Sequence, residues 1–433
     1  MRDSIYTNHQ SPLLTRPGLI TAYQLARNLP RSTHQIKIIE KHPKSSQDEY
    51  GRAITLFPRS SEMLDQLGLA EQLAQQCFAC RQTVNYDRNG KEVPGRGWSF
   101  MEEMKDTKWD FALVLRQKYQ EDIFRQALRR HGIQLDAPYT LTSFELIDAV
   151  ALGGFRILAT IEHRDTKAKS VVKCRYLVGA DGGKSFVRRA MKIPFDGSST
   201  EDKWVRIDGV VETDMPKPRS YAAIESPTHG NVLWADPNEV LGLVMKEAAT
   251  FSSGLGIYYE PDTCLTFSQS SGLSSIQAGQ RAPDVPLQKP ATFEATRLQT
   301  ETPNHATFYI VVFAGEVAQT KPSLTAFTKA ISGAKWLFDS KLPVQWLSVL
   351  AGPGGPSTFE TLEGMPFGRV FYDEDHSAHN RYDIDLKKGT VFVFRPDGWV
   401  GTLVEMDESA VGKLKKYFSR FLVGLESLHK AKL

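Results

Sequence analysis

The sequence predicts an α/β protein with a parallel sheet in its N-terminal part and a separate α/β domain at its C-terminal end. An amphipathic helix at Leu19–Leu29 is followed directly by a short apolar run, Gln35–Glu40, which is typical of a strand. A second strand, Val171–Asp181, also ends in an acid. The last third shows the order strand, helix, strand, hairpin, helix, which predicts a thioredoxin-like domain.

The composition is that of a globular protein with enough chain for two or three domains. Of 433 residues, 41% are hydrophobic and 24% charged. The net charge is only +3 and no basic stripe is interleaved with aromatic residues, so we expect no nucleic-acid partner. No apolar run approaches the ~18 residues of a membrane span, which predicts a soluble protein without a membrane partner. Four cysteines and a start without a signal-peptide pattern indicate the cytoplasm.

The first helix and strand match the second half of a βαβ dinucleotide-binding unit. In such a unit the acid at the strand end accepts the ribose hydroxyls, so Glu40 is a candidate ligand, the alternative being a solvated strand-end acid. Gly18 stands in the place of the third glycine of the G-x-G-x-x-G motif, but Leu13 and Thr15 occupy the other two glycine positions. Residues 1–10 show no apolar strand pattern. We therefore expect an incomplete Rossmann-like domain that lacks its first strand.

Further elements fit this domain. The segments Ser61–Leu73 and Arg116–Gly132 predict amphipathic helices, the second with a glycine stop. The segments Phe155–Asp165 and Val171–Asp181 predict a hairpin whose second arm enters the main sheet.

A strand–turn–helix motif follows that hairpin. Asp181 and Gly182 come after a buried strand and before a helix that starts near Ser185. Backbone N–H groups and an acid would then meet at the carboxyl end of the sheet, where ligands bind in α/β proteins. The motif therefore predicts a cofactor contact at Asp181 and Gly182, and the alternative is a plain turn.

The C-terminal third begins after a stretch rich in Ser, Gly and Pro at 268–290, which predicts a linker. No Cys-x-x-Cys lies in this third, so dithiol redox chemistry is not expected there. The elements predicted here are a strand at Thr307–Gly315, a helix that begins at Pro322, a strand at Val344–Leu350, a hairpin at Thr390–Val404 that turns at Pro396–Gly398, and a helix with Val411, Leu414 and Phe418 on its apolar face.

Seven stretches resemble, in order, the FAD-dependent aromatic hydroxylases of the phenol hydroxylase type, most like the fungal ones. The most specific is ADGGKSFVRR, at 180–189, which is similar to the Asp-Gly motif of that family. The stretches are IIEKHP, YGRAITLFPRSSEMLDQLGL, RQKYQEDIF, YLVGADGGKSFVRRAMKIPFDG, WVRIDGVVETDMP, AGQRAPDVPL and FRPDGWVG.

The resemblance implies a FAD-dependent monooxygenase that hydroxylates a small phenolic or other aromatic substrate with NAD(P)H and O2. Arg52 and Gln117 match positions that contact the flavin or its phosphates in the family. The family's C-terminal domain lies near a subunit contact, which implies a homodimer. The implied domains are an incomplete FAD-binding domain at 1–200, a remnant of the substrate domain at 201–267, the linker at 268–290 and the thioredoxin-like domain at 291–433.

The sequence also departs from the family. It lacks the Gly-Asp motif that binds the flavin side chain, and comparison with the family's pattern predicts that a stretch is missing between about Trp234 and Leu241. Ile54 stands where phenol-hydroxylating relatives can carry an acid, so no catalytic residue is predicted. Either the gene model lost exons or the chain is a natural remnant. The alternative function is therefore a non-catalytic flavoprotein remnant that acts as a scaffold or dimerisation module.

Two further groups of residues could suggest a metal or redox site. Cys77 and Cys80 have the spacing of half a zinc site, but no matching pair follows, and two buried thiols are favoured. His376 and His379 lie near Asp373 and Asp375 in sequence. We expect a structural role for them, and no metal.

Overall fold

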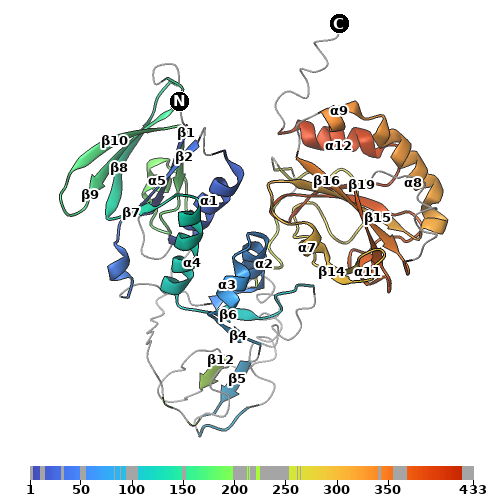
Figure 1. Ribbon diagram of the computed structural model, residues 1–433, viewed down its shortest axis with the longest axis horizontal. Coiled ribbons are helices and arrows are strands. Elements are labelled where there is room, and N and C mark those ends of the chain that lie inside the picture. The colour runs from blue at the N-terminus through green and yellow to red at the C-terminus, as the bar shows by residue number, and fades with distance from the viewer. Residues whose placement is uncertain are drawn as a thin grey trace.

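The structure is a computed structural model, shown in Figure 1. Its description covers residues 3–9, 15–30, 34–48, 55–81, 83–87, 89–93, 106–148, 153–197, 212, 214, 221–224, 253–260, 262–263, 265–339, 343–354 and 368–421.

The N-terminal part is built around a parallel sheet. Its strand order is β11 (Tyr176–Gly179), β1 (Asp3–His9), β2 (His34–Glu40) and β7 (Leu135–Asp136). Strand β1 lies between β11 and β2 and is parallel to both. The prediction that the first strand is missing is therefore wrong.

The side-chain pattern of β1 does not predict a strand. The segment has only Ile5 and Tyr6 as large apolar residues, and sequence-based strand prediction depends on such side chains. In the structure Ile5 lies opposite Tyr176 on one side and Ile36 on the other. Backbone hydrogen bonds along both edges thus satisfy the peptide groups of β1 without an apolar pattern. The absence of glycine at positions 13 and 15 is a property of the sequence, and the structure does not change it.

Each face of this sheet is covered. Helices α1 (Thr15–Asn28) and α4 (Gln117–Arg130) pack on one face, where Ile38 of β2 joins their core. The next residue, Ile39, points to the opposite face and packs in a second core with β8 and β9. Because successive side chains of a strand alternate between faces, one short strand serves two cores.

The second core belongs to an antiparallel sheet in the order β10 (Lys169–Cys174), β9 (Ile157–His163) and β8 (Tyr139–Leu146). The predicted hairpin is confirmed by the pairing of β9 with β10. Its second arm is divided at Arg175, and β11 then enters the main sheet as predicted.

Two helices stand where the sequence predicts one. Helix α2 (Pro58–Gln66) and helix α3 (Ala70–Ala74) are separated at Gly68, which has a φ of +71°. A left-handed glycine ends a helix, so the apolar pattern continues while the helix does not.

Three smaller sets of elements complete the N-terminal part. The 3-10 helix η1 (Lys44–Asp48) follows β2. A small sheet has the order β3 (Thr55–Leu56), β6 (Ala112–Val114) and β4 (Phe78–Cys80). Most of the predicted substrate domain, 201–267, lies outside the described residues, but within it β12 (Tyr221–Ile224) pairs in parallel with β5 (Thr83–Tyr86).

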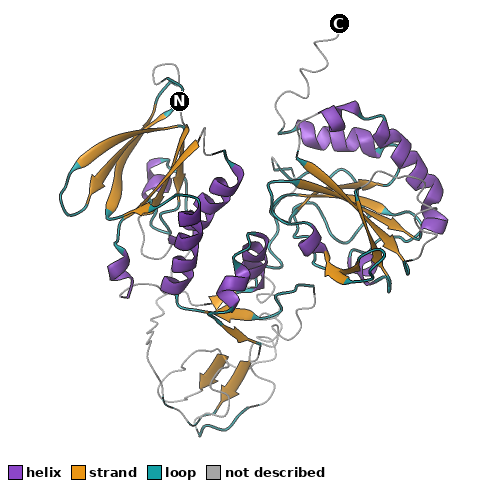
Figure 2. Ribbon diagram, viewed as in Figure 1, coloured by secondary structure: helices purple, strands orange, loops and turns teal. Residues whose placement is uncertain are grey.

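The C-terminal domain is a sheet between two layers of helices, as Figure 2 shows. Helices α8, α9 and α12 pack on one face, and α7 and α11 lie on the other. The predicted order of strand, helix, strand, hairpin and helix is present, with α9, β17 and α11 added within it. The sheet order is β14 (Ala295–Arg297), β13 (Pro286–Gln288), β17 (Arg369–Asp373), β16 (Val344–Ala351), β15 (Phe308–Gly315), β18 (Thr390–Phe394) and β19 (Val400–Glu405). The helices are α7 (Leu298–Glu301), α8 (Val317–Ser332), α9 (Lys335–Asp339), α11 (Ser377–Arg381) and α12 (Ala410–Ser419).

Two boundaries in this domain differ from the predictions. Helix α8 begins at Val317, so Pro322 lies in its second turn and does not start it. The segment at 268–290, predicted as a linker, is packed into the domain: Ile276, Val285 and Leu287 are buried against the sheet. The sequence does not predict this packing, because the segment is held by isolated apolar residues and by backbone hydrogen bonds to β19. It therefore has no regular apolar periodicity. None of the described helices has the length and apolarity to cross a bilayer.

Candidate functional site

The candidate site lies at the carboxyl edge of the parallel N-terminal sheet. Gly179 of β11 lies opposite Asn8, and Glu40 of β2 lies opposite His9, so the segments that follow β11 and β2 flank the end of β1. Residues 10–14 connect β1 to α1, which contains Gly18 as a buried residue in its first turn. The chain thus brings Glu40, Gly18 and the Asp-Gly turn to one edge, as the sequence predicts for a ligand site.

Glu40 is buried at this edge with only half of its carboxylate engaged. The side chain is 3% exposed, and its Oε1 accepts a hydrogen bond from the backbone N–H of His42 at 3.0 Å. Its Oε2 is buried and meets no hydrogen-bond donor in the described part of the chain. Burial raises the pKa of Glu40 to about 8. An unpaired buried carboxylate oxygen is costly unless a ligand pairs with it, and a ribose diol supplies suitable O–H donors.

Gln117 lies at the start of α4, the helix whose Glu121 interacts electrostatically with Glu40. It is 4% exposed, and its Nε2 donates to Glu121 Oε1 at 3.0 Å, while its own Oε1 is buried without a partner among the described residues. The segment after β2 is tied to the same turn of α4, because Lys44 donates to the carbonyl oxygen of Lys118 at 2.8 Å. The segment that follows Glu40 is therefore held against the first turn of α4, where Gln117 lies.

Two residues of this site are not found by the sequence analysis. Glu121 adds to the raised pKa of Glu40, and Arg125 acts in the opposite direction, so both charges act on that carboxyl. Arg125 lies 3.7 Å from Glu121, and its Nε is buried without a hydrogen-bond acceptor in the parts that the structure describes. The i, i+4, i+8 spacing from Gln117 is the signal that could have found them, because it places all three on one face of α4.

Asp181 is buried, but its carboxylate serves the local fold. The oxygens accept hydrogen bonds from the Ser185 hydroxyl and from the backbone N–H groups of Phe186, at 2.6 Å, and Val187, at 3.2 Å. These are the free donors at the start of α5 (Phe186–Ala190). Asp181 therefore fixes the turn at Gly182, whose φ is +84°.

The remaining predicted residues fall into two groups. Arg52 lies outside the described residues. His379 is fully buried in the C-terminal domain, where Nδ1 lies 2.7 Å from Asp373 Oδ2 and Nε2 accepts from the backbone N–H of Gly315 at 3.2 Å. Both ring nitrogens are thus used within the fold, which confirms the structural role. His376 lies at the start of α11, with a φ of 60°.

Cys77 and Cys80 lie in the core or next to it. Cys80 is buried, Cys77 is half-buried, and burial raises the pKa of the Cys77 thiol to about 11. A thiol with a raised pKa is a poor nucleophile and metal ligand. Within the described ranges, no three His, Cys, Asp or Glu side chains are grouped so that they could hold a metal ion.

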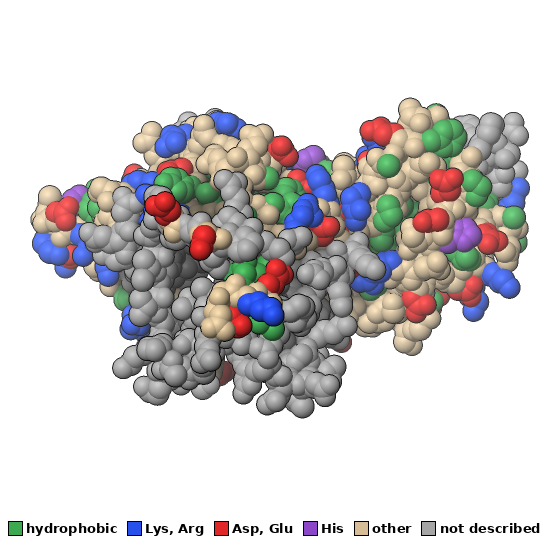
Figure 3. Space-filling model, turned by 90° about the horizontal axis from the view of Figure 1, so that it is seen from below, with side chains coloured by type: hydrophobic (Ala, Val, Ile, Leu, Met, Phe, Trp, Pro, Cys, Tyr) green, Lys and Arg blue, Asp and Glu red, His purple; other side chains and the backbone are tan. Residues whose placement is uncertain are grey.

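Charged side chains of both signs are mixed on the face shown in Figure 3. On the face shown in Figure 3, Lys and Arg alternate with Asp and Glu, and the described residues of that face form no continuous basic area. Nucleic-acid binding depends on such an area, so this face offers no support for it.

Comparisons with known proteins point to one family. Residues 18–238 match the family model described as FAD binding domain, and residues 356–426 match the phenol hydroxylase, C-terminal dimerisation domain. A FAD-dependent monooxygenase of Aspergillus terreus is 30% identical over 180 residues, which cover 42% of this chain and 24% of that protein. Phenol 2-monooxygenase fsqG of Aspergillus fumigatus is 23% identical over 210 residues, which cover 48% of this chain and 33% of that protein. The match thus spans a quarter to a third of these relatives.

The fold is similar to a solved structure over nearly its full length. Aklavinone-11 hydroxylase, in a ternary complex with FAD and aklavinone, aligns with a TM-score of 0.61 at 15% identity, covering 97% of this chain and 98% of that one. This similarity supports the α/β architecture described above.

Proposed function

The chain belongs to the FAD-binding aromatic hydroxylase family with a phenol hydroxylase dimerisation domain, and from this premise we propose that it hydroxylates a phenolic or related aromatic ring. NAD(P)H and O2 would be the co-substrates. The observation that carries the proposal is the buried Glu40 carboxylate at the carboxyl edge of the sheet, one oxygen of which has no hydrogen-bond partner among the described residues.

The residues at this edge fit FAD. Glu40 would accept hydrogen bonds from the ribose hydroxyls. Gln117, whose amide oxygen has no partner in the part of the chain that the structure describes, would contact the cofactor from the start of α4. The first turn of α1, with Gly18, would face the phosphates, since helix N-termini favour anions. Arg52 lies outside the described residues and remains a predicted phosphate contact, because a guanidinium favours anions. When bound, FAD supplies the redox chemistry that uses NAD(P)H and O2 for ring hydroxylation.

The protein contributes orientation and a low-dielectric environment. Ribose hydroxyls would donate hydrogen bonds to the ionised form of Glu40. These bonds would take the place of the hydrogen bonds to water that the carboxylate loses on burial. The Asp181 cap holds the turn at Gly182 in one conformation beside the end of β11, so that backbone N–H groups are fixed before the cofactor arrives.

A second function is favoured by two observations in the sequence. Leu13 and Thr15 stand where family members carry glycines that let the cofactor phosphates approach closely. The dimerisation domain at 356–426, in contrast, is matched. The alternative is therefore a flavoprotein remnant that self-associates as a scaffold without catalysis.

One set of measurements separates the two functions. The purified chain is titrated with FAD while the flavin absorbance and fluorescence are recorded, and its mass in solution is determined. NAD(P)H oxidation and the oxygenated product are then measured with a panel of phenols. Saturable FAD binding with product formation supports the monooxygenase. A dimer that takes up no FAD contradicts it and supports the scaffold.

A further inference from the structure

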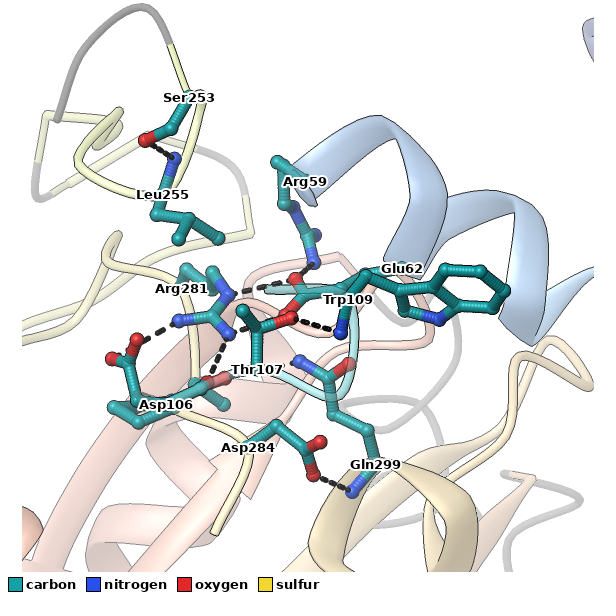
Figure 4. Close-up of polar contacts among 12 residues, drawn as sticks. Arg59, Glu62, Asp106, Thr107, Trp109, Ser253, Leu255, Arg281, Asp284 and Gln299 are labelled. Carbon is teal, nitrogen blue, oxygen red and sulfur yellow. Dashed lines mark hydrogen bonds and ion pairs between the residues drawn. The ribbon is translucent and has the colours of Figure 1, made fainter. Parts of the chain in front are cut away.

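Three charged side chains are buried together where α2 meets the C-terminal domain (Figure 4). Arg59 is 5% exposed, Glu62 1% and Arg281 4%. The guanidinium of Arg281 faces the Glu62 carboxylate with two nitrogens: Nε lies 2.8 Å from Oε2, and Nη2 pairs with Oε1. Arg59 Nη1 lies 3.1 Å from the same Oε2. One carboxylate is therefore shared by two arginines, and we call these three residues the junction cluster.

The arginines of the junction cluster come from opposite domains. The backbone of Arg281 is part of the C-terminal domain, since it bridges to Trp399 and the next residue donates to the carbonyl oxygen of Gly398 at 3.1 Å. Its side chain reaches across to Glu62 of α2. Arg59 of α2 reaches the other way: its Nη2 donates to the carbonyl oxygen of Asp397 at 2.7 Å, and its guanidinium lies 5.1 Å from the Trp399 ring centroid.

Arg281 also holds a second segment of the N-terminal part. Its Nη2 donates to the carbonyl oxygen of Asp106 at 2.6 Å, and its Nη1 lies 3.4 Å from the carboxylate of the same residue. The backbone N–H of Asp284 donates to that carbonyl oxygen as well, at 3.0 Å. Arg381 contacts the Asp106 carboxylate from the solvent side, at 2.6 Å. One side chain thus joins the C-terminal domain to α2 and to the segment at Asp106.

Such a cluster tolerates only one arrangement of the two domains. Burial alone would raise the pKa of Glu62, but the two guanidinium groups hold it below its ordinary value, so the carboxylate is ionised. Buried charges are costly unless each is paired, and a forked pair requires a fixed orientation of both partners. If the domains shift, charges are left buried without partners, and the docking geometry is therefore selected by the cluster.

The segments that Arg281 holds are next in the chain to the predicted cofactor contacts. Helix α2 follows the segment with Arg52 and strand β3. The segment at Asp106 leads into β6, which pairs with β3, and then directly into α4 and Gln117. The paired strands β3 and β6 thus connect both held segments to the cofactor edge.

We propose that Arg281 is a positioning residue through which the docked C-terminal domain sets the FAD affinity of the N-terminal domain. This inference rests on the proposed function, because it requires that FAD binds at the edge described above. It assigns the C-terminal domain a role beyond dimerisation: holding α2 and the β3–β6 pair in the arrangement that the cofactor needs.

The test compares Arg281→Met and Arg281→Lys with Arg381→Met in the full chain. Arg381→Met is the matched control, since it removes an arginine from the same Asp106 at a side chain that is 44% exposed. Hydrogen exchange of the α2 amides is measured without flavin, and the Kd for FAD is measured well below the unfolding temperature. We expect Arg281→Met to raise both the exchange rate and the Kd by about tenfold or more, and the control to change neither by more than about twofold.

Arg281→Lys keeps the charge and loses the fork, so it should fold even if Arg281→Met does not, with an intermediate Kd. A purely structural role would lower the unfolding temperature and leave the Kd of the folded protein unchanged, and that result overturns the proposal. If the native chain takes up no FAD, the proposed function fails. The hydrogen-exchange rates of the α2 amides then still test whether Arg281 holds α2 against the C-terminal domain. Unchanged exchange rates in both Arg281 variants would disprove this role.

Discussion

The carboxylate of Asp181 accepts a hydrogen bond from the backbone N–H of Phe186 at 2.6 Å, across the turn that follows β11. The same carboxylate also pairs with the Ser185 hydroxyl and with the N–H of Val187. The acid of the Asp-Gly motif is therefore occupied in holding α5 against the sheet. It stabilises the backbone conformation at Gly182, through which the proposed effect on the cofactor would act.

We expect Asp181→Asn to lower the free energy of unfolding by about 1–3 kcal/mol, because the amide has one acceptor oxygen for three buried donors. Denaturant unfolding followed by circular dichroism measures this change. Asp196→Asn is the control, since Asp196 is exposed in the segment after the same helix. Equal stability of the two variants would show that the cap contributes nothing.

Gly179 permits the close contact of β11 with α5. A Cβ at this position would lie 2.8 Å from Cβ of Val187, which is closer than carbon atoms pack. We expect Gly179→Ala to lower the free energy of unfolding by about 1–3 kcal/mol through this overlap. In Gly183→Ala, four residues on, the new Cβ would meet nothing within 4 Å, so stability should be nearly unchanged. Denaturant unfolding measures both variants. Equal unfolding midpoints for Gly179→Ala and Gly183→Ala would contradict the packing argument.

Periodic side-chain patterns account for the elements that could be predicted. Strand β2 and helix α4 show apolar residues at strand or helix spacing, and their bounds agree with the prediction to within a residue or two. Strand β1 pairs through backbone hydrogen bonds, and the segment at 268–290 is held by isolated buried apolar residues together with backbone hydrogen bonds, so neither shows such a pattern. Gly68, with its positive φ, shows why a continuous apolar stripe can still contain two helices.

The same limit applies to the sites. Glu40 could be predicted because a strand-end acid after a helix is a local pattern. Glu121 escapes the prediction although its spacing from Gln117 is local, because an acid on a helix is far more often solvated than buried. Arg281 and Glu62 are 219 residues apart, so only the folded chain brings them together. Contacts of this kind leave no trace in spacing or periodicity.

Glu40→Gln tests the cofactor site directly. At pH 8.5, where the native carboxyl is largely ionised, we expect the variant to raise the Kd for FAD by about 10–100-fold, because hydrogen bonds to a charged acceptor contribute about 1.5–3 kcal/mol. The matched control is Glu145→Gln, an exposed acid on β8. Flavin fluorescence titration provides the Kd. A Glu40→Gln value within twofold of the control would place the ribose elsewhere.

The pH dependence of stability tests the burial of Glu40 without any cofactor. Folding raises its pKa from the ordinary 4.5 to about 8, so between these pH values the folded chain keeps a proton that the unfolded chain has released. The free energy of unfolding should therefore fall as pH rises through this window, by up to about 1.4 kcal/mol per pH unit from this group. Glu40→Gln removes this component, and Glu145→Gln keeps it. Urea unfolding at a series of pH values measures the slopes, and parallel curves for the native chain and Glu40→Gln would mean that the Glu40 carboxyl is ionised and solvated in the folded protein.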